Sequence, residues 1–301
     1  MTVCDMHADT LTEKSAKTLF TPYNRSEKHA HLQFFAHFVP NGNDSPQRRR
    51  RRLMKMHEKY LYMLKKENIL AVTEQNIDKV SNSMALFSIE GGGGLFADSH
   101  ELYTLFCSGL RVLGFAWDKN ELCASSRESG NEDYGLTKEG VKLLSRIEEL
   151  GIFPDVSHMS DGATDKLLSL SRGRVLATHS NFRAVCNSRR NLTDEFAKEI
   201  AAHGGLIGIN LYPYFLNGTP EADVYDVIRH IDYGLSLVGK DAIALGLDID
   251  GTGGVYPKGF SEKESIHDAL FDALTEAYDA DTLIKIFGGN VLNFLSRPQK
   301  N

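Results

Sequence analysis

Cysteine is scarce in this sequence, with four residues in 301, and no two of them form a CxxC pair. That spacing is needed for a zinc knuckle or a dithiol redox motif, so both are excluded. The four residues stand far apart along the chain, and we expect them to be free thiols. They are Cys4, Cys107, Cys123 and Cys186.

Long apolar runs and an excess of basic charge are also missing. No apolar run approaches the roughly 18 residues of a membrane-spanning helix, and the opening MTVCDMHADT lacks the basic and apolar regions of a signal peptide. We therefore expect a cytoplasmic protein with no membrane partner. The net charge of -6 at pH 7 would repel nucleic acid, so small molecules are the expected partners.

Nucleotide-binding motifs are absent as well. No GxGxxG follows the first apolar segment, which argues against a dinucleotide-binding fold. The run GGGG at 91–94 is not followed by the Lys and the Ser or Thr of a phosphate-binding loop. We expect these glycines to let the backbone leave the preceding strand in a tight turn.

A run of five arginines, Arg48 to Arg52, could suggest a nucleic-acid contact. It begins a segment in which Leu53, Met56, Tyr60 and Leu64 recur at helical spacing. Because the chain as a whole is acidic, we interpret the run as a solvated helix face without a binding function.

The sequence is dominated by an alternation of short apolar runs and amphipathic segments. Eight apolar runs begin at residues 2, 32, 84, 110, 152, 175, 205 and 242. Helical patterns lie between them, for example over 51–67, 136–151, 161–171, 192–205 and 223–239. Continuously apolar strands are typical of a parallel sheet covered by helices, and eight such units favour a closed barrel. The predicted fold is α/β, a (β/α)8 TIM barrel formed by one domain over residues 1–301.

Side chains that can bind metals fall at the ends of these runs. Because the C-terminal ends of barrel strands converge on one face, we expect residues far apart in sequence to meet there. They are His7 and Asp9 at the first run, Glu90 at the third, His158 at the fifth, His179 at the sixth and Asp248 at the eighth.

The HxD pair of His7 and Asp9 places both side chains on one side of a strand, because residues two apart share a face. An imidazole with a carboxylate suits zinc or a similar divalent ion. Three histidines and two carboxylates exceed the needs of one four-coordinate zinc ion. The count predicts a two-metal site in which Glu90 is the shared carboxylate.

Two further positions are candidates for chemistry. Asp248, directly at the end of the last apolar run, can take up and return a proton beside a metal-bound water, and Asp250 is a rival two residues later. Arg190 precedes a helix that Thr193 is expected to cap, and its guanidinium can bind a carboxylate through two hydrogen bonds. Arg189 is equally eligible by chemistry.

The chain resembles the membrane dipeptidase (renal dipeptidase) family, the M19 metallopeptidases of the amidohydrolase-type barrels. The matching segments span nearly the whole chain in order. They are DMHADT at 5–10, SIEGG at 88–92, DVSHMSD at 155–161, THSNFRAVCNSRRNLTD at 178–194, GGLIGIN at 204–210, LGLDIDG at 245–251 and GGN at 288–290.

The resemblance implies which residues hold each zinc ion. His7 and Asp9 would bind one ion together with Glu90, and His158 and His179 would bind the second, with Glu90 shared.

It also implies that Asp248 is the acid/base carboxylate and that Arg190 binds the free carboxylate of the substrate. The family hydrolyses dipeptides, including some with a D-residue, and typically forms homodimers. We therefore expect a zinc-dependent dipeptidase in which a hydroxide bridging two zinc ions attacks the amide carbon.

One position departs from the family pattern. Many members carry a histidine after the fourth strand in a THN-like motif, whereas the segment GFAWDKN places Trp117 there. An indole N–H can donate a hydrogen bond but cannot become a cation. Trp117 is expected to contact the substrate as a wall of the pocket.

Two alternatives remain beside the dipeptidase hypothesis. One is another amidohydrolase-type reaction, on a lactone or another amide, since a barrel and two metals do not fix the substrate. Such relatives commonly bridge their metals with a lysine, which Glu90 and Trp117 at the third and fourth strand ends disfavour. The other is a metal-binding barrel with impaired catalysis, which the replacement of histidine by Trp117 keeps open.

Overall fold

The computed structural model describes residues 1–12, 26–40, 44–73, 76, 83–123, 126, 135–260 and 265–297. Within these residues eight parallel strands close into a barrel in the order β2-β1-β9-β8-β7-β6-β5-β4, and β2 pairs with β4 to complete the ring. The strands of the ring are β1 (Thr2–Ala8), β2 (Ala30–Phe38), β4 (Met84–Glu90), β5 (Leu110–Gly114), β6 (Phe153–Asp155), β7 (Leu176–Ala177), β8 (Leu206–Ile209) and β9 (Ile243–Leu245). The predicted (β/α)8 barrel is confirmed.

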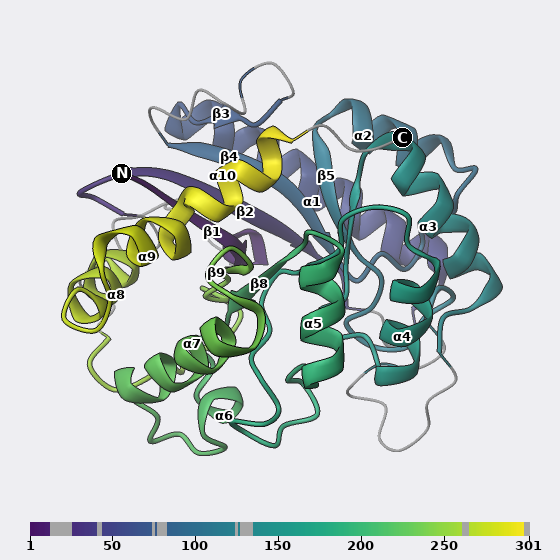
Figure 1. The fold of residues 1–301 in the computed structure, drawn as a ribbon. Coiled ribbons are helices and arrows are strands. Elements are labelled where there is room, and N and C mark those ends of the chain that lie inside the picture. The colour runs from purple at the N-terminus through teal and green to yellow at the C-terminus, as the bar shows by residue number, and fades with distance from the viewer. Residues whose placement is uncertain are drawn as a thin grey trace.

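Helices surround the strands, which lie at the centre of the molecule (Figure 1). Each of the five predicted helical segments contains a helix, and Thr193 caps α5 as expected, because its side chain accepts a hydrogen bond from the amide of Phe196 at 3.3 Å. The helices are α1 (Pro46–Glu67), α2 (His100–Cys107), α3 (Lys138–Leu150), α4 (Asp161–Leu170), α5 (Asp194–Ala202), α6 (Pro213–Leu216), α7 (Val224–Val238), α8 (Ile266–Leu274), α9 (Ala280–Ile284) and α10 (Asn290–Ser296), with a short 3-10 helix η1 (Thr10–Thr12) and a π-helical segment η3 (Lys285–Gly289).

Some observed elements lie outside the apolar runs and the helical segments named from the sequence. The two-residue strand β3 (Leu70–Ala71) pairs with the start of β4 outside the ring. The helices α2, α6, α8, α9 and α10 also have no counterpart in the predicted segments.

The interior of the barrel is apolar near the N-terminal ends of its strands. Inward-facing side chains such as Met6 and Phe34 are fully buried there. Helix α10 contributes to the same cluster through Phe294, whose ring centre lies 4.5 Å from that of Phe153. The side chains that can bind a metal lie at the opposite, C-terminal end of the barrel.

The glycine run after β4 makes the tight turn that was predicted. Gly91 has a φ of 75°, and a Cβ there would lie 2.8 Å from the carbonyl oxygen of Val39. Gly94 has a φ of 97°, and its Cβ would lie 2.7 Å from the carbonyl oxygen of Pro46. Both positions therefore require a residue without a side chain.

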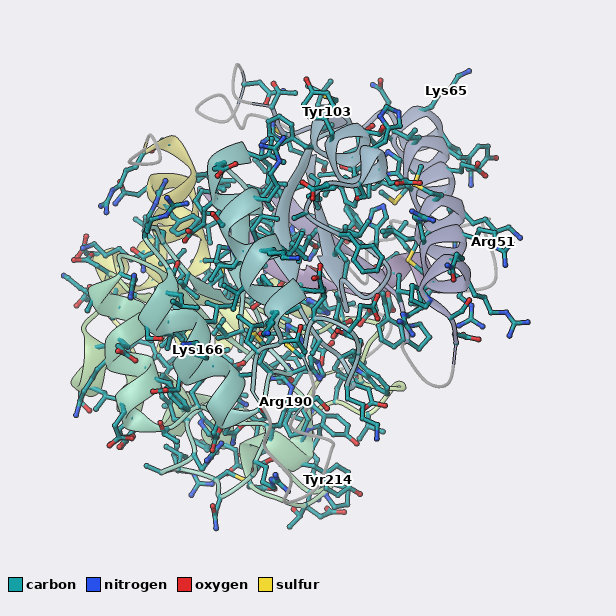
Figure 2. The ribbon with its side chains drawn as sticks, turned by 90° about the vertical axis from the view of Figure 1, so that its right-hand side faces the viewer. Arg51, Lys65, Tyr103, Lys166, Arg190 and Tyr214 are labelled. Carbon is teal, nitrogen blue, oxygen red and sulfur yellow. The ribbon has the colours of Figure 1, made fainter. Side chains whose placement is uncertain are left out.

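The arginine run is a solvated face only in part, and the interpretation was wrong for Arg49. Its side chain is buried, and its guanidinium pairs with the carboxylate of Glu121, which also accepts a hydrogen bond from the amide of Gly94. Arg51, by contrast, projects outward from α1 (Figure 2). Arg49 thus ties the start of α1 to the loops that follow β4 and β5.

The four cysteines are free thiols, as predicted. Across the described ranges of the chain, no helix combines the length and the apolar character needed to cross a membrane.

Candidate metal centre

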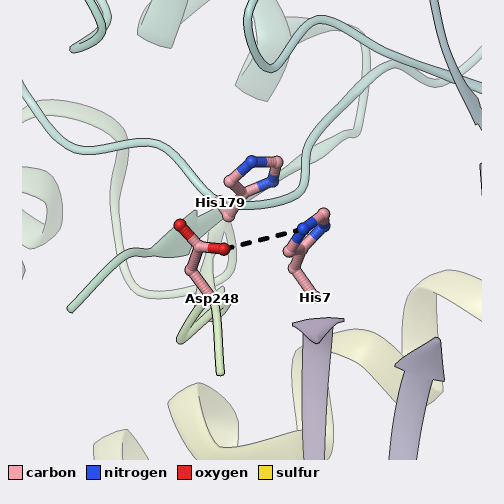
Figure 3. Close-up of side chains that lie close together, drawn as sticks. All are labelled: His7, His179 and Asp248. Atoms are coloured by element: carbon pink, nitrogen blue, oxygen red, sulfur yellow. Dashed lines mark ion pairs between the residues drawn. The ribbon is translucent and has the colours of Figure 1, made fainter. Parts of the chain in front are cut away.

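The end of β1 brings His7 into contact with three carboxylates. His7 Nε2 lies 3.4 Å from Asp9 Oδ2, 3.7 Å from Glu90 Oε2 and 3.7 Å from Asp248 Oδ1. Figure 3 shows His7 and Asp248 facing each other beside His179. His7 and Asp9 lie side by side as expected, but β1 ends at Ala8, so Asp9 stands just past the strand rather than on its face. Residues more than 240 positions apart meet here.

A second group lies on the other side of Glu90. Its Oε1 is 2.9 Å from His158 Nε2 and 3.5 Å from His179 Nε2, and these two nitrogens are 3.0 Å from each other. The rings of His7 and His179 stack with centres 3.7 Å apart, which joins the two groups into one cluster. Glu90 thus presents one oxygen to each group.

Several of these residues lie beyond the strands rather than at their last positions. The strand β9 ends at Leu245 and β6 at Asp155, whereas Asp248 and His158 stand three residues later. Both have a left-handed backbone, with φ of 62° for Asp248 and 69° for His158. This conformation costs non-glycine residues free energy, and both residues that adopt it contribute side chains to the cluster, Asp248 beside His7 and His158 beside Glu90.

Burial and charge together set the protonation of the first group. Burial disfavours the imidazolium of His7, but Glu90, Asp9 and Asp248 outweigh it and raise the pKa of His7 to about 10. Burial and repulsion from Glu90 raise the pKa of Asp9 to about 7. Among the described residues Asp9 Oδ1 is buried without a hydrogen-bond partner. Crowded carboxylates with an orphaned oxygen are suited to a cation.

The second group is prepared for a cation as well. Burial alone would raise the pKa of Glu90, but His7, His158 and His179 hold it well below its usual range, so the carboxylate is ionised. Burial, together with the charges of His7 and Arg190, keeps the pKa of His179 well below its usual value, which leaves the imidazole neutral. A neutral imidazole and an ionised carboxylate are the forms that bind metals.

The donor set therefore fits two divalent ions. One set is His7, Asp9 and Glu90, and the other is Glu90, His158 and His179; the ligand atoms within each set lie within 4.8 Å of one another. A third grouping, His7, His179 and Asp248, reuses the same histidines (Figure 3). Mixed imidazole and carboxylate donors favour zinc over the oxygen-preferring Mg²⁺ and Ca²⁺.

Of the two arginines considered, Arg190 is the one beside the cluster. Its guanidinium donates to the carbonyl oxygen of His179 at 3.0 Å and to Ser180 Oγ at 2.9 Å, and its side chain is buried. Arg189 is exposed. Figure 2 shows Arg190 between the barrel and Tyr214 at the edge of the molecule.

The two aspartates of LGLDIDG have different partners. Asp248 faces His7, while Asp250 Oδ2 accepts a hydrogen bond from Thr10 Oγ1 at 2.7 Å and its amide donates to Tyr256 Oη at 2.9 Å. Asp250 is therefore part of a loop contact, and Asp248 is the carboxylate at the cluster.

Trp117 lies three residues beyond β5 and is partly exposed. Its ring centre is 6.1 Å from that of His158 and 5.2 Å from that of Phe38, which it meets edge-on. The indole thus stands beside one member of the cluster, on an aromatic wall shared with Phe38.

Asn210, buried just past β8, has no counterpart among the residues predicted from the sequence. Its side-chain amide donates to Asp248 Oδ2 at 3.0 Å, and its backbone amide donates to Asn181 Oδ1 at 3.0 Å. The available signal was its position at the end of the seventh apolar run, GLIGIN.

A (β/α)8 barrel that gathers three histidines and three carboxylates at its C-terminal face has the architecture of the metal-dependent hydrolase barrels. Within that class the chain belongs to the membrane dipeptidase family, peptidase family M19, whose family model matches residues 6–300. The family resemblance stated from the sequence motifs is confirmed.

The individual relatives share a third or less of their residues with this chain over the matched region. A Klebsiella pneumoniae protein described as "Uncharacterized protein in pqqA 5'region" is 32% identical over 227 residues, which cover 72% of this chain and 82% of that protein. Dipeptidase 3 of Homo sapiens is 25% identical over 236 residues, 77% of this chain and 48% of its own length. The chain spans about half the length of this curated dipeptidase.

Solved structures share the fold over nearly the whole chain. A metallopeptidase from Rhodobacter sphaeroides, liganded with a phosphinate mimic of the dipeptide L-Ala-D-Ala, superposes with a TM-score of 0.83 at 23% identity and covers 99% of both chains. Dipeptidase AC, a metallopeptidase of family M19, superposes with a TM-score of 0.85 at 24% identity, with 99% of this chain and 98% of that chain covered.

Proposed function

We propose that this protein is a dipeptidase that requires two zinc ions and acts as a single catalytic domain. The observation that carries the proposal is the position of Glu90, whose two oxygens face His7 on one side and His158 with His179 on the other. Membership of peptidase family M19 supports the same reaction. Two divalent ions held there would lower the pKa of a water and polarise the scissile carbonyl.

Asp248 is the proposed proton carrier. Its Oδ1 lies 3.7 Å from His7 Nε2, at the edge of the cluster, and its Oδ2 accepts a hydrogen bond from the side-chain amide of Asn210. Burial raises its pKa above the ordinary value, which brings a carboxylate closer to the pH at which it can both accept and release a proton. Asp248 would take the proton of the attacking water and pass it to the leaving amine.

Arg190 is the proposed site for the free carboxylate of the dipeptide. It is a buried cation whose guanidinium already borders His179 through the carbonyl oxygen of that residue. Arginine can bind a carboxylate through two parallel hydrogen bonds, which fixes the orientation as well as the charge. A substrate held there would present its peptide bond to the histidines of the second group.

The substrate range is proposed to include dipeptides with a C-terminal D-residue, as in the phosphinate mimic bound by the Rhodobacter sphaeroides neighbour. Trp117 and Phe38 would form an apolar wall for one of the two side chains. We further propose a homodimer in the cytoplasm. The four free thiols support a reducing compartment, and size-exclusion chromatography with light scattering tests the dimer.

Turnover of the zinc-loaded protein tests the proposed function. Protein with two equivalents of zinc should cleave members of a panel of L,L and L,D dipeptides, and a chelator should abolish cleavage. Asp248→Ala should lower kcat by about 10²- to 10⁴-fold with the metal content retained. No turnover across the panel by protein with both metals bound would refute the dipeptidase assignment and favour a lactonase-type reaction or a barrel with impaired catalysis.

Substrate analogues separate the role of Arg190 from that of the metals. Wild-type protein should prefer a dipeptide over its C-terminal amide, and Arg190→Lys should reduce that preference about 10-fold or more, since one bidentate contact to a carboxylate is lost. Arg189→Lys, at the exposed neighbour, is the matched control and should leave the preference unchanged.

A further inference from the structure

Two buried aspartates outside the metal-binding sets occupy equivalent positions beside them. Asp5 lies on β1, two residues before His7, and Oδ1 of Asp5 accepts hydrogen bonds from the amide of His7 at 3.2 Å and from the amide of Leu247 at 3.0 Å. Its Oδ2 pairs with His267 Nε2 of α8 at 2.9 Å, and both side chains are fully buried. Asp5 therefore joins the ends of two neighbouring strands, β1 and β9.

Asp155 repeats this arrangement at the junction of β6 and β7. Its Oδ1 accepts hydrogen bonds from the amide of Ser157 at 3.1 Å and from the amide of Thr178 at 2.9 Å. Its Oδ2 accepts the hydroxyl of Thr178 at 2.6 Å. In both cases one carboxylate oxygen accepts hydrogen bonds from the amide two residues ahead and from an amide just past the end of the adjacent strand.

The amides held in this way belong to or directly precede the residues of the site. Asp5 holds the amide of His7 itself and the amide of Leu247, the residue before Asp248. Asp155 holds the amides of the residues immediately before His158 and His179. Each aspartate thus serves one of the two metal-binding sets.

The strands themselves do not reach these positions. The strand β7 consists of Leu176–Ala177 and β9 of Ile243–Leu245. Backbone hydrogen bonds continue beyond them, from Ser180 N to Gly208 O at 2.7 Å and from Asp9 N to Ile249 O at 2.8 Å, but the amides of Thr178 and Leu247 donate to the two aspartates. A buried amide without an acceptor destabilises the folded chain. The carboxylates supply the acceptors for the amides of Thr178 and Leu247 and so hold the backbone where it enters the loops of the site.

Thr178 carries the effect of Asp155 one step further. Its hydroxyl has a single proton, which goes to Asp155 Oδ2, so its oxygen must accept from His179 Nδ1 at 2.8 Å. A proton on Nδ1 leaves the lone pair on Nε2, the nitrogen that faces Glu90 and His158. The chain from Asp155 through Thr178 therefore selects the tautomer of His179 that can bind a metal.

We propose that Asp5 and Asp155 are positioning residues, each of which aligns the ligands of one metal: Asp5 for the ion at His7, Asp9 and Glu90, and Asp155, through Thr178, for the ion at Glu90, His158 and His179. The proposal rests on the two-metal site of the proposed function. It assigns to two non-ligating carboxylates, at the β1–β9 and β6–β7 junctions of the ring, separate control over the occupancy of the two metals.

Thr178→Val tests the second half, because valine keeps the shape of threonine and removes only the hydroxyl. We expect zinc affinity at the His158 and His179 set to fall about 10- to 100-fold, with a much smaller change at the set of His7. Anomalous scattering from crystals equilibrated with limiting zinc measures the occupancy of each set. Thr164→Val is the matched control, since Thr164 is fully buried and its hydroxyl has no hydrogen-bond partner among the described residues.

Asp5→Ala tests the first half, and the selective loss should fall on the set of His7 and Asp9. The control is Asp226→Ala on α7, which also removes a buried carboxylate that accepts hydrogen bonds, from Asn217 Nδ2 and from the amide of Asp223. Asp226→Ala should lower the free energy of unfolding without changing either occupancy. If Asp5→Ala does not fold, Asp5→Asn, which keeps one acceptor, should show the same selectivity to a smaller extent.

The outcomes distinguish this proposal from the proposed function. Equal losses at both sets in Thr178→Val and in the Asp5 variant, or no loss in either, would overturn the positioning roles even if wild-type protein cleaves dipeptides. Selective losses would support them even if no dipeptide is cleaved, since occupancy is measured without turnover.

Discussion

The side-chain amide of Asn210 lies 3.0 Å from Asp248 Oδ2 and donates a hydrogen bond to it, so the proposed proton carrier is oriented by a neutral group from the adjacent strand end. The same amide group is 3.4 Å from the carbonyl oxygen of His179, which Arg190 also contacts. Asn210 therefore connects Asp248 with Arg190 through the carbonyl oxygen of His179, which both Asn210 and Arg190 contact.

Removing the side-chain amide of Asn210 should change how kcat/KM depends on pH on the acidic side. Burial raises the pKa of Asp248, and the hydrogen bond from Asn210 opposes it by stabilising the carboxylate. Asn210→Ala should therefore raise that pKa further, move the acidic limb of kcat/KM to higher pH, and lower kcat about 10-fold, the effect of losing one hydrogen bond to a charged group. Asn290→Ala, at a buried asparagine that donates to the carbonyls of Lys240 and Ile243, is the control; an unshifted limb in Asn210→Ala would argue against Asp248 as the titrating group.

Substitution of Trp117 distinguishes an apolar wall from a hydrogen-bond donor. Trp117→Phe keeps a ring beside Phe38 and should leave kcat within about threefold, whereas Trp117→Ala should raise KM about 10-fold through the lost apolar contact. Steady-state kinetics on one good dipeptide measure both. A fall in kcat of about 10²-fold in Trp117→Phe would show instead that the indole N–H stabilises the transition state.

The arginine run offers a matched pair for stability. Arg49→Ala leaves the largely buried carboxylate of Glu121 without its cation and should lower the free energy of unfolding by about 3–5 kcal/mol. Arg51→Ala, at an exposed position of the same helix, should change it by no more than about 0.5 kcal/mol. Urea denaturation of both variants checks the difference, and equal effects would contradict the structural role of Arg49.

Acid should destabilise the metal-free protein through His230. Its Nδ1 accepts the amide of Phe182 at 3.3 Å and its Nε2 donates to the carbonyl oxygen of Leu216 at 2.9 Å, so only the neutral ring fits. Burial lowers its pKa from 6.5 to about 4. The unfolded chain therefore takes up this proton first as the pH falls, and stability present above pH 6.5 is lost towards pH 4, by about 3 kcal/mol for this group.

His230→Asn, whose amide oxygen can still accept from Phe182, should show a shallower loss over the same pH range. Denaturant unfolding of the metal-free protein at several pH values measures the slope. His100→Asn, at an exposed histidine of α2, is the control and should retain the wild-type slope, and an unchanged slope in His230→Asn would exclude this histidine as a source of acid lability.

The fold and the members of the metal cluster were predictable because each leaves a local signal. An apolar run marks a strand, and in a parallel barrel the residue after the run must lie at the C-terminal face, which was enough to bring together residues as distant as His7 and Asp248. The sequence placed Asp248 and His158 at strand ends, whereas left-handed backbone carries them beyond. That difference depends on loop conformation, which periodicity does not report.

The partners of the cluster could not be predicted in the same way. Asp5 and Asp155 stand inside the motifs DMHADT and DVSHMSD, but their roles follow from contacts with Leu247 and Thr178, which lie just past the ends of other strands. Likewise, nothing in the repeated arginines distinguishes Arg49 from its neighbours, because burial at that position is decided by a loop that follows β5. Such contacts are properties of the assembled barrel.

The connection that Asp5 makes between β1 and the end of β9 has a consequence for the order of folding. It joins residues 242 positions apart, whereas His158 and His179 are separated by 21. Contacts of long sequence separation form late, because the intervening chain must be ordered first. Apart from Glu90, the part of the centre at His158 and His179 can assemble from one contiguous segment. The part at His7 also needs Asp248 and forms only when β1 and β9 pair and the ring closes. The pair of His158 and His179 would therefore reach its final arrangement before His7 meets Asp248.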